Sequence, residues 1–341
     1  MANVSALSSS PAVDVINMAS RGHGVDDTTW LALRVVHGCL AAAAVVVNCL
    51  SLVVIYGVVP RLTPRLQLLT SLSFSDMLSA WAVMTLYFSY SVCQESINIS
   101  LLLCACNASA WLMIALTTSH SVAIFRPLHY NKIVSQRRVW AVIALAWFVG
   151  VFMACSGFLA TAAGHYVDLL PFCVQAHAHQ QVALIVSTFL TAGAFFFTAF
   201  MCGRIVAHLR PIESIANGGE TSTSRRSTHR VTSTVMVAAL HAVTWMPYLI
   251  VKCVQLSRGV REDSVAITVG LAVCHTLILG ACLLNPILCA LRMTSLQTGY
   301  HRLYRRSRDC AAKMWFRIKR KETDANEQPS TPLNPLMESA Y

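Results

Sequence analysis

Charged residues are scarce in this chain, and their scarcity sets the class of protein. Aspartate, glutamate, lysine and arginine make up 12% of the residues, whereas 55% are hydrophobic. A water-soluble chain of this size needs alternating polar and apolar faces to cover its surface. The composition therefore excludes an ordinary soluble domain and indicates a protein surrounded by lipid.

The chain also lacks the short motifs of common catalytic sites. It contains neither a Gly-x-Ser-x-Gly elbow nor a His-Glu-x-x-His zinc motif, and no two carboxylates share an apolar stretch. His177 and His179 form a lone pair of imidazoles, which is a poor metal site by itself. Duplicated halves with interrupted helices, as in many transporters, are not evident. We therefore expect no enzyme and no transporter.

Seven long apolar stretches fill most of the chain between Leu31 and Leu291. A helix needs roughly 20 mainly apolar residues to cross a bilayer. Backbone groups in lipid must be paired within the segment, so each stretch must be helical. The sequence predicts an all-α membrane protein, a seven-helix bundle with short connections, whose spans are 31–55, 66–92, 99–125, 139–163, 181–209, 231–256 and 265–291.

The net charge of +11 is concentrated in the connections after odd-numbered spans and in the tail. The positive-inside rule places these segments in the cytosol and the N-terminus outside. Each basic residue near an anionic leaflet contributes about 1 kcal/mol, so the excess charge indicates membrane lipid and not nucleic acid as its partner. We expect an extracellular segment 1–28, a bundle 29–291, a short cytosolic amphipathic helix 292–310 and a disordered tail 311–341.

Covalent modifications follow from this topology. Of the thirteen cysteines, only Cys93 and Cys173 fall clearly in outer connections, where the compartment is oxidising. We expect a Cys93–Cys173 disulfide, with Cys104 as the competing partner. Glycosylation sequons at Asn3 and Asn98 lie on the predicted outer side.

The predicted surface helix has an apolar side formed by Leu296, Tyr300, Leu303 and Tyr304. Cys310 follows directly and is placed for palmitoylation. Stable anchoring needs a second signal, which the neighbouring basic cluster supplies.

Polar residues within the spans are costly and need a reason. Asp76 is the only acidic residue deep inside a span, and Asn48, Ser109 and Asn285 lie at similar depth in other spans. If all four point inward, they form one polar cluster. Two interpretations remain open: a hydrogen-bonded structural link with Asp76 protonated, or a site for a small monovalent cation such as Na⁺.

Five landmarks occur in a fixed order along the spans. They are Asn48, Leu72-Ser73-x-x-Asp76, Trp147, Trp245-Met246-Pro247 and Asn285-Pro286. In these landmarks the chain resembles the rhodopsin-like (class A) family of G-protein-coupled receptors. The resemblance implies a plasma-membrane receptor that transmits binding of a small extracellular ligand to a cytosolic G protein or arrestin, with a dimer as a further option.

Three stretches, 122–130, 133–137 and 284–292, are similar to odorant receptors. Trp245-Met246-Pro247, in contrast, follows the general receptor pattern. A divergent orphan or chemosensory receptor fits this mixture.

The departures from the family pattern fall at the cytosolic ends of the third and seventh spans, in the motifs that the family uses to switch between resting and active states. Ser119-His120-Ser121 stands where the family has Asp-Arg-Tyr, and Cys289 replaces the tyrosine of Asn-Pro-x-x-Tyr. A histidine, with a reference pKa of about 6.5, cannot reproduce a permanent forked cation. The alternative hypothesis is therefore a receptor-fold protein that does not signal or couples atypically, such as a ligand sink or dimer partner.

The resemblance places a ligand site above the tryptophan of the sixth span. Spacings of three and four put Trp245, Tyr248 and Lys252 on one helical face. An aromatic floor with a cation and an imidazole at the rim suits a small anionic or amphipathic ligand. An equally good interpretation is that the aliphatic part of the Lys252 side chain lies along the span and its ammonium group reaches the outer membrane–water interface. The expected lining is completed by His275, Leu102 and Cys106.

Pro247 frees a backbone carbonyl and kinks the sixth span, which supplies a hinge for a cytosolic opening motion. The other expected switch residues are His120, Asn285, Pro286 and Cys289.

Overall fold

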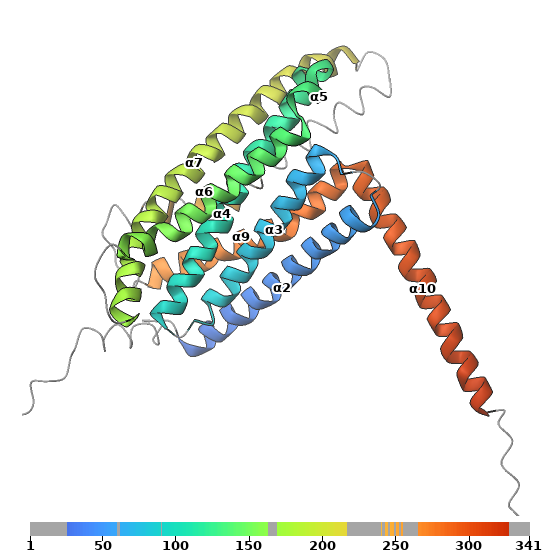
Figure 1. Ribbon diagram of the computed structural model, residues 1–341, viewed down its shortest axis with the longest axis horizontal. Helices are drawn as coiled ribbons and strands as arrows, with labels where there is room; N and C mark the ends of the chain where they lie inside the picture. The colour runs from blue at the N-terminus through green and yellow to red at the C-terminus, as the bar shows by residue number, and fades with distance from the viewer. Residues whose placement is uncertain are drawn as a thin grey trace, which may run out of the picture.

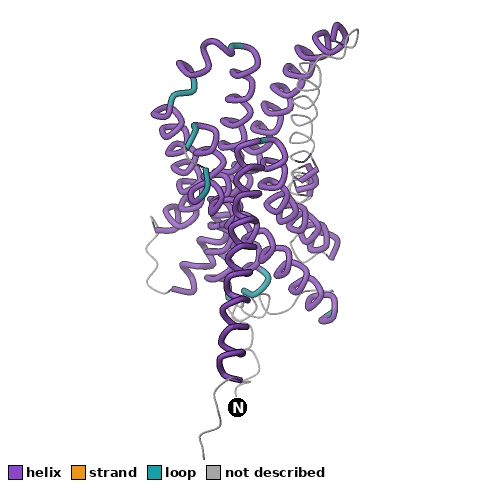
Figure 2. The backbone as a smooth tube through the Cα atoms, turned by 90° about the vertical axis from the view of Figure 1, so that its right-hand side faces the viewer, coloured by secondary structure: helices purple, strands orange, loops and turns teal. Residues whose placement is uncertain are grey.

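A computed structural model describes residues 26–59, 62–89, 91–162, 169–216 and 265–326, together with 240, 243–244, 246–248, 250–251 and 254. The sixth predicted span, with Trp245 and Lys252, therefore lies mostly outside the described residues. All regular elements within these ranges are helical (Figure 2). In chain order they are α2 (Asp27–Gly57), α3 (Pro64–Leu86), α4 (Val92–Phe125), η1 (Pro127–His129), α5 (Tyr130–Ile133), α6 (Gln136–Ala162), α7 (Leu169–Ala216), α9 (Val265–Arg292) and α10 (Thr294–Asn326).

The long helices α2, α3, α4, α6, α7 and α9 run side by side along one axis (Figure 1). Helix α4 is central, because it packs against α3, α6 and α7. Helix α10 leaves the end of α9 and runs across the bundle axis (Figure 1). We call the two ends of the bundle the α10 end and the disulfide end, where α2, α4 and α7 begin.

Five described helices, α2, α4, α6, α7 and α9, are long and apolar enough to cross a membrane. Helix α3, the second predicted span, packs beside α2 and α4 and has most of its residues buried. It can therefore carry serines and Asp76 without presenting them to lipid.

The bundle is apolar outside and partly polar inside, the reverse of a soluble protein. His37, Asn48, Asp76 and Asn107 are almost fully buried. Lipid tails accept apolar side chains but offer no hydrogen bonds, so this distribution is the one a bilayer requires. The large side chains exposed on the outer surface include Phe74, Trp81, Trp140, Phe148, Phe152, Phe189, Phe196 and Phe200.

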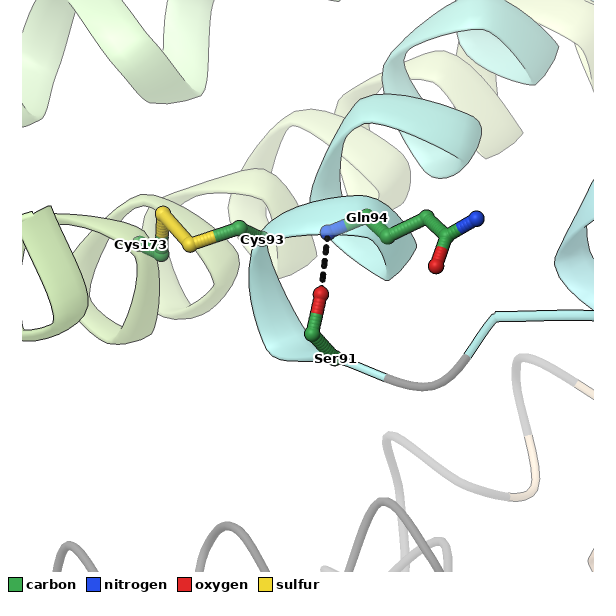
Figure 3. The surroundings of a disulfide bond; sticks show 4 residues. All are labelled: Ser91, Cys93, Gln94 and Cys173. Atoms are coloured by element: carbon green, nitrogen blue, oxygen red, sulfur yellow. Dashed lines mark hydrogen bonds between the residues drawn. A yellow bond between two sulfur atoms is a disulfide. The ribbon is translucent and has the colours of Figure 1, made fainter.

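Capping residues set where three helices begin. The Asp26 carboxylate accepts the backbone N–H of Thr29 and the hydroxyls of Thr28 and Thr29. These hydrogen bonds lower the pKa of Asp26 to about 2. Thr63 and Ser91 cap α3 and α4 in the same way (Ser91 in Figure 3).

Several helices are longer than predicted, so the predicted boundaries of these helices are wrong. Helix α4 begins at Val92 and α7 at Leu169, so both extend well beyond the apolar stretches that predicted them. Cys93 and Cys173 consequently lie within helices and not in loops. Helix α10 reaches Asn326, past the predicted end at 310, so the first part of the expected disordered tail is helical. Hydropathy marks only the lipid-embedded part of a helix, whereas polar turns can continue it.

Helices α4 and α6 approach closely at Gly150. A Cβ atom on Gly150 would lie 2.6 Å from the backbone carbonyl oxygen of Cys104. One turn earlier, Trp147 Nε1 donates to Ser71 Oγ of α3 at 2.8 Å. A small residue at this crossing is what close helix packing in membranes requires.

We predict that Gly150→Ala destabilises the bundle by about 1–3 kcal/mol, because α6 must move away from the α4 backbone. The measurement is the apparent Tm of the purified protein in detergent. Gly203→Ala on α7 is the matched control, since a Cβ atom at Gly203 would meet nothing within 4 Å and the Tm of this variant should not fall. Equal Tm values for the two variants would contradict the close approach.

Candidate functional site

The inner part of the bundle contains a carboxylate and an amide in direct contact. Asn285 Nδ2 of α9 donates to Asp76 Oδ2 of α3 at 3.0 Å. Asp76 is buried, so the bond ties two neighbouring helices inside the bundle. This contact agrees with the structural-link interpretation of the polar cluster.

A small cavity of about 30 Å³ lies beside this pair. A volume of this size accommodates one or two water-sized species. Its polar lining comes from Asp76, Ser79, Ser109, Asn285 and Thr244, and Met113, Leu240, Ile278, Ala281 and Cys282 complete it.

Asn48 is placed differently from the other three members of the predicted cluster. It is fully buried, and its Nδ2 donates to the carbonyl oxygens of Ala44 and Cys282, both at 2.9 Å. Asn48 thus ties α2 to α9 and is not part of the cavity lining. Its Oδ1 has no hydrogen-bond partner among the described residues.

The donor set of the cavity fits a small hard cation. One carboxylate and the hydroxyls of Ser79 and Ser109 are oxygen ligands of the kind that such ions prefer. When bound, a cation would neutralise Asp76, which otherwise is a carboxyl group in a low-dielectric interior. The lining residues are therefore suited to hold Na⁺, and the Na⁺ site stays a prediction.

A second polar cluster lies nearer the disulfide end, between α2, α3 and α9. Tyr87 Oη contacts His275 Nδ1 at 3.2 Å. The Tyr87 ring stacks on His37, with ring centroids 4.0 Å apart. His37 is buried between two backbone carbonyls, with Nδ1 2.7 Å from Leu33 O and Nε2 3.2 Å from Ala272 O.

Sequence reasoning singled out His275 but missed His37 and Tyr87. The available signal was His37 itself, an imidazole within the first apolar stretch, because such a residue needs a partner inside the bundle. Tyr87 gave no comparable signal. Arg34 Nε also donates to the Tyr87 carbonyl at 3.0 Å, which fixes the end of α3 against α2.

The described members of the predicted ligand site come together near this cluster. Leu102, Cys106 and Tyr248 are buried and belong to one apolar cluster with Tyr87, which in turn contacts His275. Trp245 and Lys252 lie outside the described residues. The predicted lining is thus assembled from α4, α9 and the described part of the sixth span.

The predicted Cys93–Cys173 disulfide is confirmed (Figure 3). It joins the first turn of α4 to α7, with the two Cα atoms 5.0 Å apart. Cys104, the competing partner, is buried with a free thiol. The bridge therefore holds the starts of two adjacent helices together.

The two predicted glycosylation sites differ in what the structure describes. Asn3 lies outside the described residues. Asn98 is buried, its Nδ2 donates to Ser89 Oγ at 2.6 Å, and its Oδ1 accepts from Thr85 Oγ1 at 2.9 Å. A glycan on this nitrogen would have to displace both contacts, so the arrangement disfavours modification of Asn98.

At the α10 end, an arginine of α3 is linked through Tyr130 to Ser119, the first residue of the Ser119-His120-Ser121 triplet. Arg65 Nε of α3 donates to Tyr130 Oη at 3.1 Å, and its guanidinium lies 4.9 Å from the centre of the Tyr130 ring. Tyr130 Oη also contacts Ser119 Oγ at 3.2 Å. In the sequence, Arg65 is one of the basic residues between the first and second predicted spans, and nothing there indicates this contact.

The remaining switch candidates occupy varied environments. Pro286 and Cys289 are buried in α9, and Cys289 packs in the apolar cluster at the α10 end. His120 is half-buried on α4, and Pro247 lies in the short described stretch 246–248. Cys310 is exposed on α10.

Comparison with known families identifies the chain. The family described as 7 transmembrane receptor (rhodopsin family) matches residues 47–288, which is more than half of the chain. The protein therefore belongs to the rhodopsin family of seven-transmembrane receptors. It is accordingly a multi-pass membrane protein of a class that consists of receptors and not enzymes. No match was found among curated proteins.

We predict that Na⁺ stabilises the protein through Asp76. Replacing NaCl by choline chloride should lower the apparent Tm of the wild type by about 2–4 °C for each kcal/mol of binding lost. Asp76→Asn should remove this difference because it removes the only carboxylate of the cavity lining.

Ser75→Ala is the matched control. Ser75 is the buried neighbour of Asp76, donates to Leu72 O at 2.9 Å and does not line the cavity. Its Na⁺ response should equal that of the wild type. Identical wild-type melting in both salts would leave the Asp76–Asn285 contact as a structural link alone.

Proposed function

We propose that the protein is an orphan or chemosensory plasma-membrane receptor that transmits binding of a small extracellular ligand to a cytosolic G protein. One observation carries the proposal. Helix α9 contacts α3 at two levels, through His275 with Tyr87 and through Asn285 with Asp76. The two levels lie about 15 Å apart along α9. A ligand that shifts α9 near His275 must therefore also act on the inner pair.

The ligand site lies toward the disulfide end. Tyr248, Leu102 and Cys106 offer an apolar and aromatic surface, and His275 offers an imidazole. Trp245 and Lys252 remain candidate members from their spacing alone. This mixture suits a small amphipathic or anionic molecule.

Two independent features support an extracellular disulfide end. Disulfides form in oxidising compartments, and the Cys93–Cys173 bridge is at this end. The α10 end carries most of the described basic residues, Arg34 being an exception, as the cytosolic side of a membrane protein does. Those described include Arg65, Arg126, Lys132, Arg137 and Arg138.

Arg65 gives the cytosolic end a cation in place of the missing arginine. It is held by Tyr130, which also contacts Ser119 at the position of the family's acidic residue. Since a guanidinium keeps its charge and its forked geometry, Arg65 can stabilise the resting arrangement or contact a G protein. Opening about Pro247 would expose this region.

A second candidate function is a receptor-fold protein that does not signal. The observation that favours it is the same contact, because Arg65 belongs to α3 and is already engaged with Tyr130. On this hypothesis, the Arg65–Tyr130 contact joins α3 permanently to α5, where the family has a contact that breaks on activation. The protein would then serve as a ligand sink or a dimer partner.

The deciding experiment compares the native chain with a repaired variant, Ser119→Asp with His120→Arg. Surface expression is verified first, and G-protein and arrestin pathways are then assayed with a broad ligand library. We expect the native chain to give a dose-dependent response in at least one pathway. Ser121 is left unchanged because it is buried at 2% exposure, and a tyrosine there would overpack α4.

The outcomes separate the two functions. A native response equal to the repaired one refutes the non-signalling hypothesis. A silent native chain beside a repaired chain that responds by tenfold or more, about 1.4 kcal/mol of coupling, supports it. Silence of both chains at verified surface density counts against the receptor proposal itself.

A further inference from the structure

Helix α10 continues far beyond its contact with the bundle. It meets α2 within its first two turns, where Tyr300 Oη lies 2.6 Å from Ser51 Oγ. A Cβ atom on Gly299 would lie 2.5 Å from a side-chain carbon of Val54, so the two helices are closely packed there. Residues 304–320, in contrast, are all exposed. The outer half of α10 is therefore a surface that the described part of the bundle leaves uncovered (Figure 1).

Large apolar side chains lie on opposite sides of this outer half. Met314, Trp315, Phe316 and Ile318 are each more than half exposed. Successive residues of an α-helix are turned by about 100°, so Met314 and Phe316 point about 200° apart, with Trp315 between them. Exposed large apolar side chains that lie together mark an interaction surface. A flat surface covers one side of a helix, whereas this cluster needs contacts on both sides.

The same part of α10 is strongly basic. Residues 310–321 include no aspartate or glutamate, and the preceding Asp309 has its carboxylate 3.5 Å from the Arg308 guanidinium. Lys319 Nζ lies 5.0 Å from the centre of the Trp315 ring, so positive charge adjoins the aromatic surface. The basic residues here are Lys313, Arg317, Lys319, Arg320 and Lys321.

These two properties together select the kind of partner. The partner must be acidic, since the segment is basic, and it must enclose the helix, because apolar side chains point to both sides. An anionic bilayer meets the first condition but covers one side alone. Calcium-loaded sensor proteins of the EF-hand type meet both, because they open an apolar, methionine-rich groove and take up basic amphipathic helices.

We propose that residues 311–321 of α10 are the docking segment for an acidic calcium-sensor protein that encloses the helix in an apolar groove. Trp315 and Phe316 enter the groove, and the basic side chains pair with carboxylates at its rim. Trp315 lies about 20 Å along α10 from Tyr300, which leaves room for a protein beside the bundle. The cytosolic location of this segment rests on the proposed function, but docking requires neither a ligand nor a G protein.

The test measures binding of purified calmodulin, used as the probe, to the full-length protein in nanodiscs of phosphatidylcholine, with and without phosphatidylserine. Calcium opens the groove of the probe, so we expect at least about tenfold tighter binding in Ca²⁺ than in the chelator EGTA, in both kinds of disc. Since opposite charges contribute, high salt should weaken this binding.

Trp315→Ser and Phe316→Ser should each weaken the calcium-dependent binding by at least about tenfold, because both side chains enter the groove. Leu128→Ser is the matched control. Leu128 lies in η1, away from α10, and is 93% exposed, so the control also replaces an exposed apolar side chain by serine. Its affinity for calmodulin should equal that of the wild type.

Each contrary outcome has a defined meaning. Absence of calcium-dependent binding overturns the proposal, and so does an equal loss of affinity in Leu128→Ser. Binding that Trp315→Ser weakens and Phe316→Ser does not would also overturn it, because the contact would then be one-sided. Binding that phosphatidylserine abolishes would overturn it in favour of the bilayer. The measurement is direct binding, so its failure leaves the signalling test of the proposed function unaffected.

Discussion

The structure depends on one constraint, which is that the polar side chains carried into lipid need partners inside the bundle. Asp76 is the strongest case, because the free-energy cost of exposing a carboxyl group to lipid is high. The hydrogen bond from Asn285 lowers this cost inside the bundle. The same requirement accounts for Asn48 binding the α9 backbone and for His37 lying between two carbonyls. These contacts converge on α9 from α2 and α3 and fix the relative positions of the three helices.

This arrangement links features that would otherwise seem independent. The outer contact of His275 with Tyr87 and the inner contact of Asn285 with Asp76 share the same two helices. Under the proposed function, a change at one level would be transmitted to the other through α9. At the α10 end, Arg65 and Tyr130 supply contacts where the family's usual switch residues are replaced.

The fold class and part of the site were predictable from local signals. Apolar length predicted spanning helices, and the described part of the bundle agrees, with a family match across residues 47–288. Oxidising location predicted the Cys93–Cys173 pair, which the structure confirms. Helix ends at Val92, Leu169 and Asn326 were mispredicted, because polar residues continue a helix without leaving a hydropathy signal. The role of Arg65 was missed because its contact with Tyr130 joins residues far apart in the chain, and the sequence around an arginine does not indicate such a contact.

By itself the sequence determined that this protein lies in a membrane, because apolar length and scarce charge are additive properties that need no partner. It also determined which polar residues would have to be satisfied. Only the tertiary structure decided how, since Asn48 faces the α9 backbone while Ser109 faces the cavity. Tyr87 joined His37 to His275, and Tyr300 of α10 met Ser51 of α2, through contacts between helices distant in the chain. Such pairings depend on the rotation of one helix against another, which no local pattern encodes.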